Sequence, residues 1–119
     1  MIPPDGRGMI VIIESPFKCA TKEEAARNLE YAKAALRDSL LRGEAPFASH
    51  LLYTLVLDDS KPEERKLGME AGFKFVHRAD FTAVYDDLGI SRGMHLGIDR
   101  AQDACLRIEF RQIPGWVLK

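Results

Sequence analysis

Residues 84–94 constrain the fold more than any other part of the chain, and they read VYDDLGISRGM. An apolar strand ends there on two acids, the chain turns at Gly89, and a helix follows with Ser91 and Gly93 at its start. In open α/β sheets such a junction binds ligands, because the crevice lies outside the carboxyl ends of parallel strands and helix N-terminal amides attract anions. The segment therefore predicts an α/β sheet with a candidate site at this edge.

The remaining sequence repeats the same alternation of strand and helix. Capped or amphipathic segments predict three helices, at 21–43, at 62–77 and from 91 onward. Short apolar or alternating runs predict four strands, at 9–13, 45–50, 81–85 and 106–110, the last of them edge-like. Right-handed crossovers convert this order into a parallel sheet with helices on both faces.

The predicted helices carry capping and packing signals. Thr21 with Glu24, and Ser60 with Glu63, have the S/T-x-x-E spacing of a capping box. Helical spacing also predicts the buried positions of the first and third helices. These are Ala25, Leu29, Ala32, Leu36 and Leu40 in the first, and Met94, Ile98, Ala101 and Cys105 in the third.

The second predicted helix has more apolar coverage than one buried face requires. Three apolar side chains share one side and three lie elsewhere: Leu67, Ala71 and Phe75, then Met69, Phe73 and Val76. Surplus apolar surface marks interaction sites. We therefore predict a homo-oligomer with Phe73 or Val76 at the subunit interface.

Length, charge and cysteine usage limit the function classes. A chain of 119 residues forms one domain, predicted over 9–119 after a flexible arm at 1–8. The net charge of −1 disfavours nucleic-acid binding, and no apolar stretch approaches the roughly 20 residues that span a bilayer. Cys19 and Cys105 form no CxxC pair, and the histidines lack metal-ligand spacing. We expect no metal, no cofactor, no membrane partner, and a bacterial cytoplasm as the location.

Three motifs occur in order along the predicted elements. Ser-Pro-Phe-Lys at 15–18 follows the first strand, Pro-Phe-Ala-Ser-His-Leu-Leu-Tyr at 46–53 surrounds the second, and Asp-Leu-Gly-Ile-Ser-Arg-Gly-Met at 87–94 follows the third. Together they resemble a small bacterial and phage branch of the nucleoside 2-deoxyribosyltransferase-like superfamily. The resemblance implies a flavodoxin-like or Rossmann-like three-layer sandwich with a four- to five-stranded parallel sheet. It also implies a nucleoside or nucleotide pocket at the carboxyl ends of the strands.

Active members of that superfamily carry a catalytic carboxylate on the helix after the Gly-Met turn. Gly93 and Met94 match the turn, but counting forward to the usual glutamate reaches Gly97. Asp99 is a poor substitute, because two helical steps rotate a side chain by about 200°. We therefore predict a nucleotide- or nucleoside-binding protein that lacks the usual catalytic glutamate. A glutamate introduced at position 97 is expected to project toward the sugar site.

Eight residues are candidate ligand contacts by their position at strand ends and helix starts. Ser15, Lys18 and Ser91 suit a phosphate, while Phe17 suits the wall of a base pocket. His50 suits hydrogen bonding or proton transfer. Each also has an ordinary structural reading, as a turn, a core aromatic, an exposed charge or a helix cap. The remaining candidates are Asp86, which suits sugar hydroxyls, and Gly93 and Met94.

Two alternatives remain open. The first is a 2′-deoxynucleoside 5′-phosphate N-hydrolase or deoxyribosyltransferase with a relocated catalytic carboxylate. Asp87 and Glu70 are its candidates, and Glu14 is a further place to search. Glu70 belongs to a Gly-Met-Glu sequence, but inside a predicted helix rather than after a strand. The second alternative is a non-catalytic assembly or interaction protein.

Overall fold

The computed structural model describes residues 8–18 and 20–116. The predicted arm at 1–8 therefore lies outside the described residues except for its last position. Four strands are present: β1 (Ile10–Glu14), β2 (Ala45–Phe47), β3 (Phe81–Tyr85) and β4 (Arg107–Arg111). The helices are α1 (Lys22–Leu41), α2 (Ser49–Leu52), α3 (Pro62–Phe73) and α4 (Arg92–Asp103), with two 3₁₀ turns, η1 (Tyr53–Leu55) and η2 (Lys74–His77).

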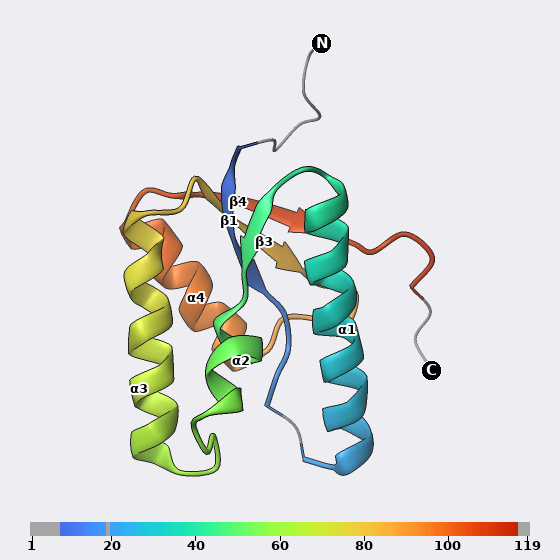
Figure 1. Ribbon diagram of the computed structural model, residues 1–119, viewed down its shortest axis with the longest axis vertical. Helices are drawn as coiled ribbons and strands as arrows, with labels where there is room; N and C mark the ends of the chain where they lie inside the picture. The colour runs from blue at the N-terminus through green and yellow to red at the C-terminus, as the bar shows by residue number, and fades with distance from the viewer. Residues whose placement is uncertain (1–7, 19, 117–119) are drawn as a thin grey trace.

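The four strands form one parallel sheet in the order β2-β1-β3-β4. Figure 1 shows α1 on one face of the sheet, α3 and α4 on the other, and α2 beyond the carboxyl ends of the strands. This arrangement confirms the predicted α/β, Rossmann-like class. No helix in the described ranges is long and apolar enough to cross a membrane.

The two central strands are covered on both faces, which explains their continuous apolar sequences. All five residues of β3 are buried, as are Val11, Ile12 and Ile13 of β1. The last strand, β4, lies at an edge as predicted.

The buried face of α1 differs from the predicted one. Of the five predicted positions, Ala32 is buried and Leu36 is partly buried, whereas Leu29 and Leu40 are exposed. The face turned to the sheet carries Asn28, Tyr31, Ala32, Ala35 and Ser39. The prediction failed because three of these five residues are polar and each donates a hydrogen bond inside the fold: the hydroxyl groups of Tyr31 and Ser39 donate to carboxylates, and the Asn28 amide donates to a backbone carbonyl.

Other sequence predictions also need correction. Ser49 and His50 do not extend β2 but begin α2. Ser60 does not cap α3, whose N-cap residue is Lys61; the Ser60 hydroxyl donates to Asp58 instead. Val76 is 7% exposed and belongs to the core, so it does not fit the predicted subunit interface. Phe73, the other residue predicted there, is half-buried, and the Arg100 guanidinium covers its ring.

The third predicted helix is correct except at its end. Met94, Ile98 and Ala101 are buried on α4, but the helix stops at Asp103. Cys105 lies beyond it, exposed, with a φ of 56°. A left-handed residue cannot continue the helical stripe.

Candidate functional site

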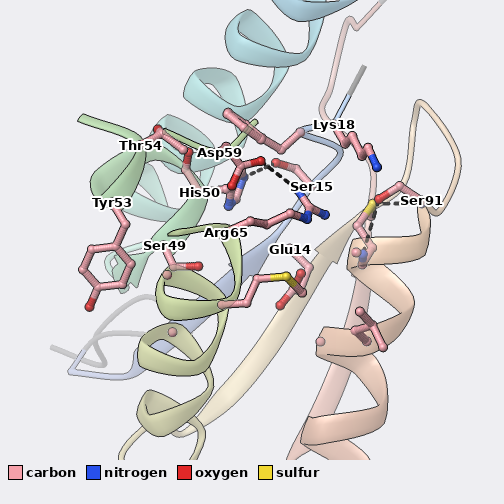
Figure 2. Close-up of a pocket in the computed structure, with 18 of the residues that line it drawn as sticks. Glu14, Ser15, Lys18, Ser49, His50, Tyr53, Thr54, Asp59, Arg65 and Ser91 are labelled. Carbon is pink, nitrogen blue, oxygen red and sulfur yellow. Dashed lines mark hydrogen bonds and ion pairs between the residues drawn. The ribbon is translucent and has the colours of Figure 1, made fainter. Parts of the chain in front are cut away.

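A cavity of about 810 Å³ lies at the carboxyl ends of β1 and β2, between α2, α3 and the start of α4. Figure 2 shows side chains from these elements converging on one space, with Arg65 and Glu14 between α3 and α4. The strand order places this space beside the central strand β1, where the connections leave toward opposite faces of the sheet. Such switch points are where open α/β sheets bind ligands.

Glu14 ends β1 inside this cavity. A Cβ atom at position 97 of α4 would overlap the Glu14 carboxyl group, which therefore occupies the space where a side chain of α4 would begin. Burial raises the pKa of Glu14 from its ordinary 4.5 to about 8, and no hydrogen bond or ion pair from a described residue opposes that effect. At neutral pH the group is thus largely an uncharged carboxylic acid.

The Gly97 contact corrects one expectation. A glutamate introduced at position 97 would have to displace the Glu14 carboxyl group before it could reach the sugar site. The space was predicted to be open, whereas a carboxyl group from β1 already fills it. A carboxyl group is therefore present beside α4 at this point, but it belongs to Glu14 of β1 and not to the helix.

Ser15 and His50 form a polar pair in the same cavity. The Ser15 hydroxyl lies 2.7 Å from His50 Nε2, and the Phe17 ring meets the imidazole edge-on. Burial lowers the pKa of His50 from 6.5 to about 4, so the imidazole is neutral at pH 7 and the pair carries no charge. Gly72 of α3 keeps His50 in place, since a Cβ there would lie 2.9 Å from Ser49 and push α2 away.

Positive charge enters the cavity from α3. Arg65 forms an ion pair with Asp59 at 2.6 Å, and its Nη2 atom lies 3.8 Å from where a Cβ of Gly93 would stand. Gly93 lies in the first turn of α4, which Ser91 caps by accepting a hydrogen bond from the Met94 N–H at 3.3 Å. A guanidinium group beside helix N-terminal amides suits an anion.

Seven of the eight predicted ligand contacts line the cavity. They come from the loop after β1, from α2 and from the start of α4: Ser15, Phe17, Lys18, His50, Ser91, Gly93 and Met94. Met94 is almost fully buried, so its role includes core packing.

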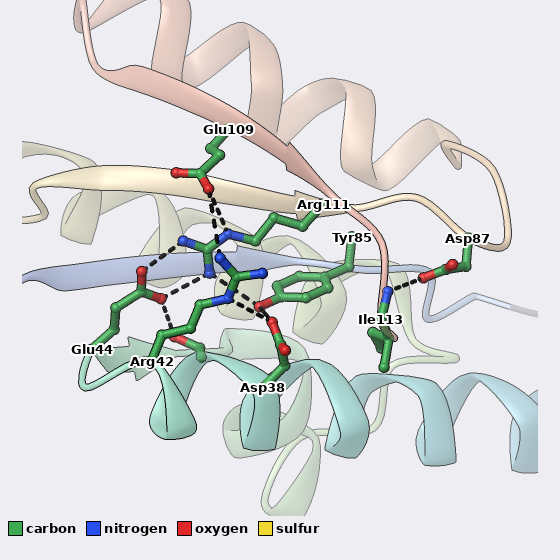
Figure 3. Close-up of polar contacts among 9 residues, drawn as sticks. Asp38, Arg42, Glu44, Tyr85, Asp87, Glu109, Arg111 and Ile113 are labelled. Atoms are coloured by element: carbon green, nitrogen blue, oxygen red, sulfur yellow. Dashed lines mark hydrogen bonds and ion pairs between the residues drawn. The ribbon is translucent and has the colours of Figure 1, made fainter. Parts of the chain in front are cut away.

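The structure places the three predicted acids away from the cavity. Asp87 accepts hydrogen bonds from the Tyr31 hydroxyl at 2.7 Å and the Ile113 N–H at 2.8 Å, a contact drawn in Figure 3. Asp86 accepts one from the Gln112 amide. Glu70 is exposed on α3, 3.9 Å from Lys66. The carboxylates of Asp86 and Asp87 accept hydrogen bonds from other segments of the chain, and that of Glu70 faces solvent. We assign none of the three a role in the cavity.

Sequence reasoning gave too little weight to Glu14 and missed Arg65. A lone acid directly after an apolar central strand, opposite a helix glycine, is the signal that could have raised Glu14. Arg65 lies in a charged helical segment and has no distinguishing pattern. In the described ranges, no group of three or more histidine, cysteine or acidic side chains is placed to hold a metal ion.

Comparisons with known proteins place the chain in a family. A family described as a domain of unknown function (DUF7768) matches residues 9–111, and the chain belongs to it. No curated protein matches the sequence. Among solved structures, the fold is similar to that of the 2-deoxyribosyltransferase of the psychrotolerant bacterium Bacillus psychrosaccharolyticus, whose described use is nucleoside synthesis. The TM-score is 0.58 at 16% identity, covering 92% of this chain and 77% of that one, so the chain has a deoxyribosyltransferase-like fold.

Proposed function

We propose that the cavity beside β1 binds a nucleoside or nucleotide. The observation that carries this proposal is the combination in one space of uncharged hydrogen-bonding groups and a cationic group at a helix start. A volume of about 810 Å³ is ample for such a ligand, since small-molecule sites typically span roughly 300–1,000 Å³.

The lining suggests how each part of the ligand is held. Arg65 and the first amides of α4 suit a phosphate, because a guanidinium group and helix N-terminal N–H groups both favour anions. Phe17 offers an aromatic surface for a base. The Ser15–His50 pair offers donor and acceptor atoms to sugar or base.

A ligand screen tests the proposal. Thermal shift and calorimetry with deoxynucleosides, deoxynucleoside 5′-monophosphates and cyclic dinucleotides should show binding by at least one class. If none shifts the melting temperature or releases heat, the proposed function is wrong.

Arg65→Ala tests the phosphate position. We expect roughly ten- to a hundredfold weaker binding of monophosphates, because hydrogen bonds to charged groups are worth about 1.5–3 kcal/mol. Lys66→Ala is the matched control, since Lys66 is the neighbouring cation but points into solvent. Equal losses in both variants would show a general charge effect instead of a phosphate site.

Glu14 favours a second candidate, an N-hydrolase or deoxyribosyltransferase for deoxynucleotides. Its carboxyl group lines the cavity, whereas the carboxylates of Asp87 and Glu70 lie away from it. In hydrolysis the bond from C1′ to the base nitrogen breaks, water supplies the new hydroxyl group on C1′, and its proton leaves with the base. Chromatography of deoxynucleoside monophosphates incubated with wild type and with Glu14→Gln tests this, and activity that Glu14→Gln retains in full excludes Glu14.

A further inference from the structure

The Glu14 side chain and Gly97 are complementary in shape. A Cβ at position 97 would overlap Glu14 Oε2 and would lie 2.8 Å from Oε1, far inside contact distance. The carboxyl group is therefore pressed against the backbone of α4, and its position depends on the absence of a side chain there. This glycine has an ordinary helical conformation, so space rather than backbone freedom explains it.

Within the described residues, nothing bonds to the Glu14 carboxyl group, although it lines the cavity. The Glu14 side chain is half-buried, and its carboxyl oxygens stay accessible in the cavity without a protein hydrogen-bond partner in the described part of the chain. A carboxyl group without one, directed into a cavity, is a place where a ligand would complete the bonding.

We propose that the Glu14 carboxyl group donates a hydrogen bond to an uncharged acceptor atom on the sugar or base of the ligand, and that Gly97 is required for this contact. The inference rests on the proposed nucleoside or nucleotide function and adds a specificity-determining residue to it. The raised pKa of Glu14, about 8, agrees with this role, because only the protonated carboxyl group can donate.

The phosphate is the less suitable partner for Glu14. An anion beside a carboxyl group is destabilised once that group ionises, whereas Arg65 and the start of α4 attract it. Other titratable or charged groups also line the cavity and could contribute to its pH dependence. They are Lys18 after β1, Glu24 on α1, His50 on α2, Tyr53 on η1, Asp59 before α3, Glu64 and Arg65 on α3, and Arg92 on α4.

The test is the pH dependence of affinity, measured by calorimetry with deoxyadenosine, deoxycytidine and 2-deoxyribose between pH 7 and 9.5. None of these probes changes its own charge in that range. Wild-type affinity should hold up to about pH 8 and then fall about tenfold per pH unit as Glu14 loses its proton. Loss with 2-deoxyribose as well places the acceptor on the sugar; loss with the nucleosides alone places it on the base.

Glu14→Gln isolates Glu14 from the other titratable groups. The amide still donates a hydrogen bond but cannot ionise, so binding at pH 7 should stay within a few-fold and the fall above pH 8 should disappear. Glu14→Ala should bind at least tenfold more weakly at pH 7.

A double-variant cycle tests the role of Gly97. Gly97→Ala should weaken binding by displacing the carboxyl group, but in the Glu14→Ala background it should have little further effect, because the conflicting atoms are gone.

The outcomes separate the two proposals. If no ligand of the screen above binds, both proposals are wrong; if one binds but none of the three probes does, the Glu14 inference alone is overturned. If a probe binds equally to wild type and Glu14→Ala, or if Glu14→Gln keeps the fall above pH 8, the Glu14 inference alone is overturned.

Discussion

Two titratable side chains in the cavity are held without charge at neutral pH. Burial raises the pKa of Glu14 to about 8 and lowers that of His50 to about 4. Both shifts have the same cause, since burial penalises the charged form of an acid and of a base alike. The cavity therefore combines neutral donors and acceptors with the cationic Arg65, a mixture that suits a ligand with one anionic and one neutral part.

The Glu14 carboxyl group should make stability depend on pH even without ligand. Its folded-state pKa lies above its ordinary value of 4.5, so the full stability is present below about pH 4.5 and is lost as pH rises to about 8. Glu14→Gln removes this loss. We expect the variant to match wild type at pH 4 and to exceed it by about 2–4 kcal/mol at pH 8.5. A pKa change from 4.5 to about 8, at about 1.4 kcal/mol per pKa unit, gives about 5 kcal/mol, and solvent in the cavity screens part of it.

Urea unfolding at the two pH values measures this difference. His50 acts in the opposite direction, because its depressed pKa makes the fold lose stability as pH falls through the range from 6.5 to about 4. The comparison of variant with wild type cancels that effect. An unchanged difference between pH 4 and pH 8.5 would contradict the raised pKa of Glu14.

A buried ion pair lies between the sheet and α1. Arg111 and Glu44 are each 3% exposed at the side chain, with contacts of 2.6 and 2.8 Å, and Ser39 also donates to Glu44 (Figure 3). Burial acts to raise the pKa of Glu44, but the hydrogen bonds from Arg111 and Ser39 outweigh it and lower the pKa. The pair thus contributes stability above the ordinary pKa and loses it in acid.

Glu44→Gln should destabilise the fold by about 3 kcal/mol at pH 7, because it leaves the Arg111 charge buried without its partner. Glu109→Gln is the matched control: Glu109 also accepts from Arg111, at 3.1 Å, but is 38% exposed. We expect it to cost less than about 1 kcal/mol. If both variants unfold at similar midpoint urea concentrations, burial of the ion pair does not increase its contribution to stability.

At the scale of elements, the sequence predicted each strand and long helix but not every face. The apolar continuity of β1 and β3 identified the centre of the sheet, and Ser91 identified the start of α4. The buried face of α1 was misjudged because Asn28 and Tyr31 are polar by type and become buried only through tertiary hydrogen bonds. Such bonds join residues far apart in the chain, and no local pattern reveals them.

The site was predictable to the same extent. Strand ends and helix starts identified most of its lining, because the topology of a parallel sheet brings them together. The contact between Glu14 and Gly97 could not be predicted, since it depends on how closely α4 approaches β1. The Arg65 position depends likewise on the packing of α3.

Two identical capping signals should differ in energy. The Glu24 N–H donates to Thr21 Oγ1 at 3.1 Å, whereas Ser60 makes no cap for α3. Thr21→Ala should therefore cost about 1 kcal/mol, the usual value for an N-cap. Ser60→Ala is expected to change stability by less than about 0.5 kcal/mol, as at other exposed positions. Thermal unfolding of both variants measures this, and an equal or larger loss at Ser60 would refute it.

At the scale of the whole molecule, the cavity depends on the order of the strands. β1 lies between β2 and β3. The helix that follows β1, α1, covers one face of the sheet, whereas α3, before β3, and α4, before β4, cover the other (Figure 1). Segments that are distant in sequence, at 14–18, 49–54, 59–73 and 91–97, therefore border one space. For this reason the Glu14 carboxyl group at the end of β1 can lie beside Gly97 of α4 in the same cavity.

The predicted homo-oligomer has a revised interface. Val76 is part of the core, but Leu55 and Val56 are 77% and 80% exposed, and Leu67 is 60% exposed. Exposed apolar side chains of this size favour burial against another surface, at about 25 cal/mol per Å². We expect light scattering at micromolar concentration to give a mass of at least twice 13.4 kDa. Val56→Glu should return the mass to that of the monomer, whereas Leu41→Glu, at a similarly exposed leucine on α1, should not. A wild-type mass of 13.4 kDa would rule out assembly through this surface.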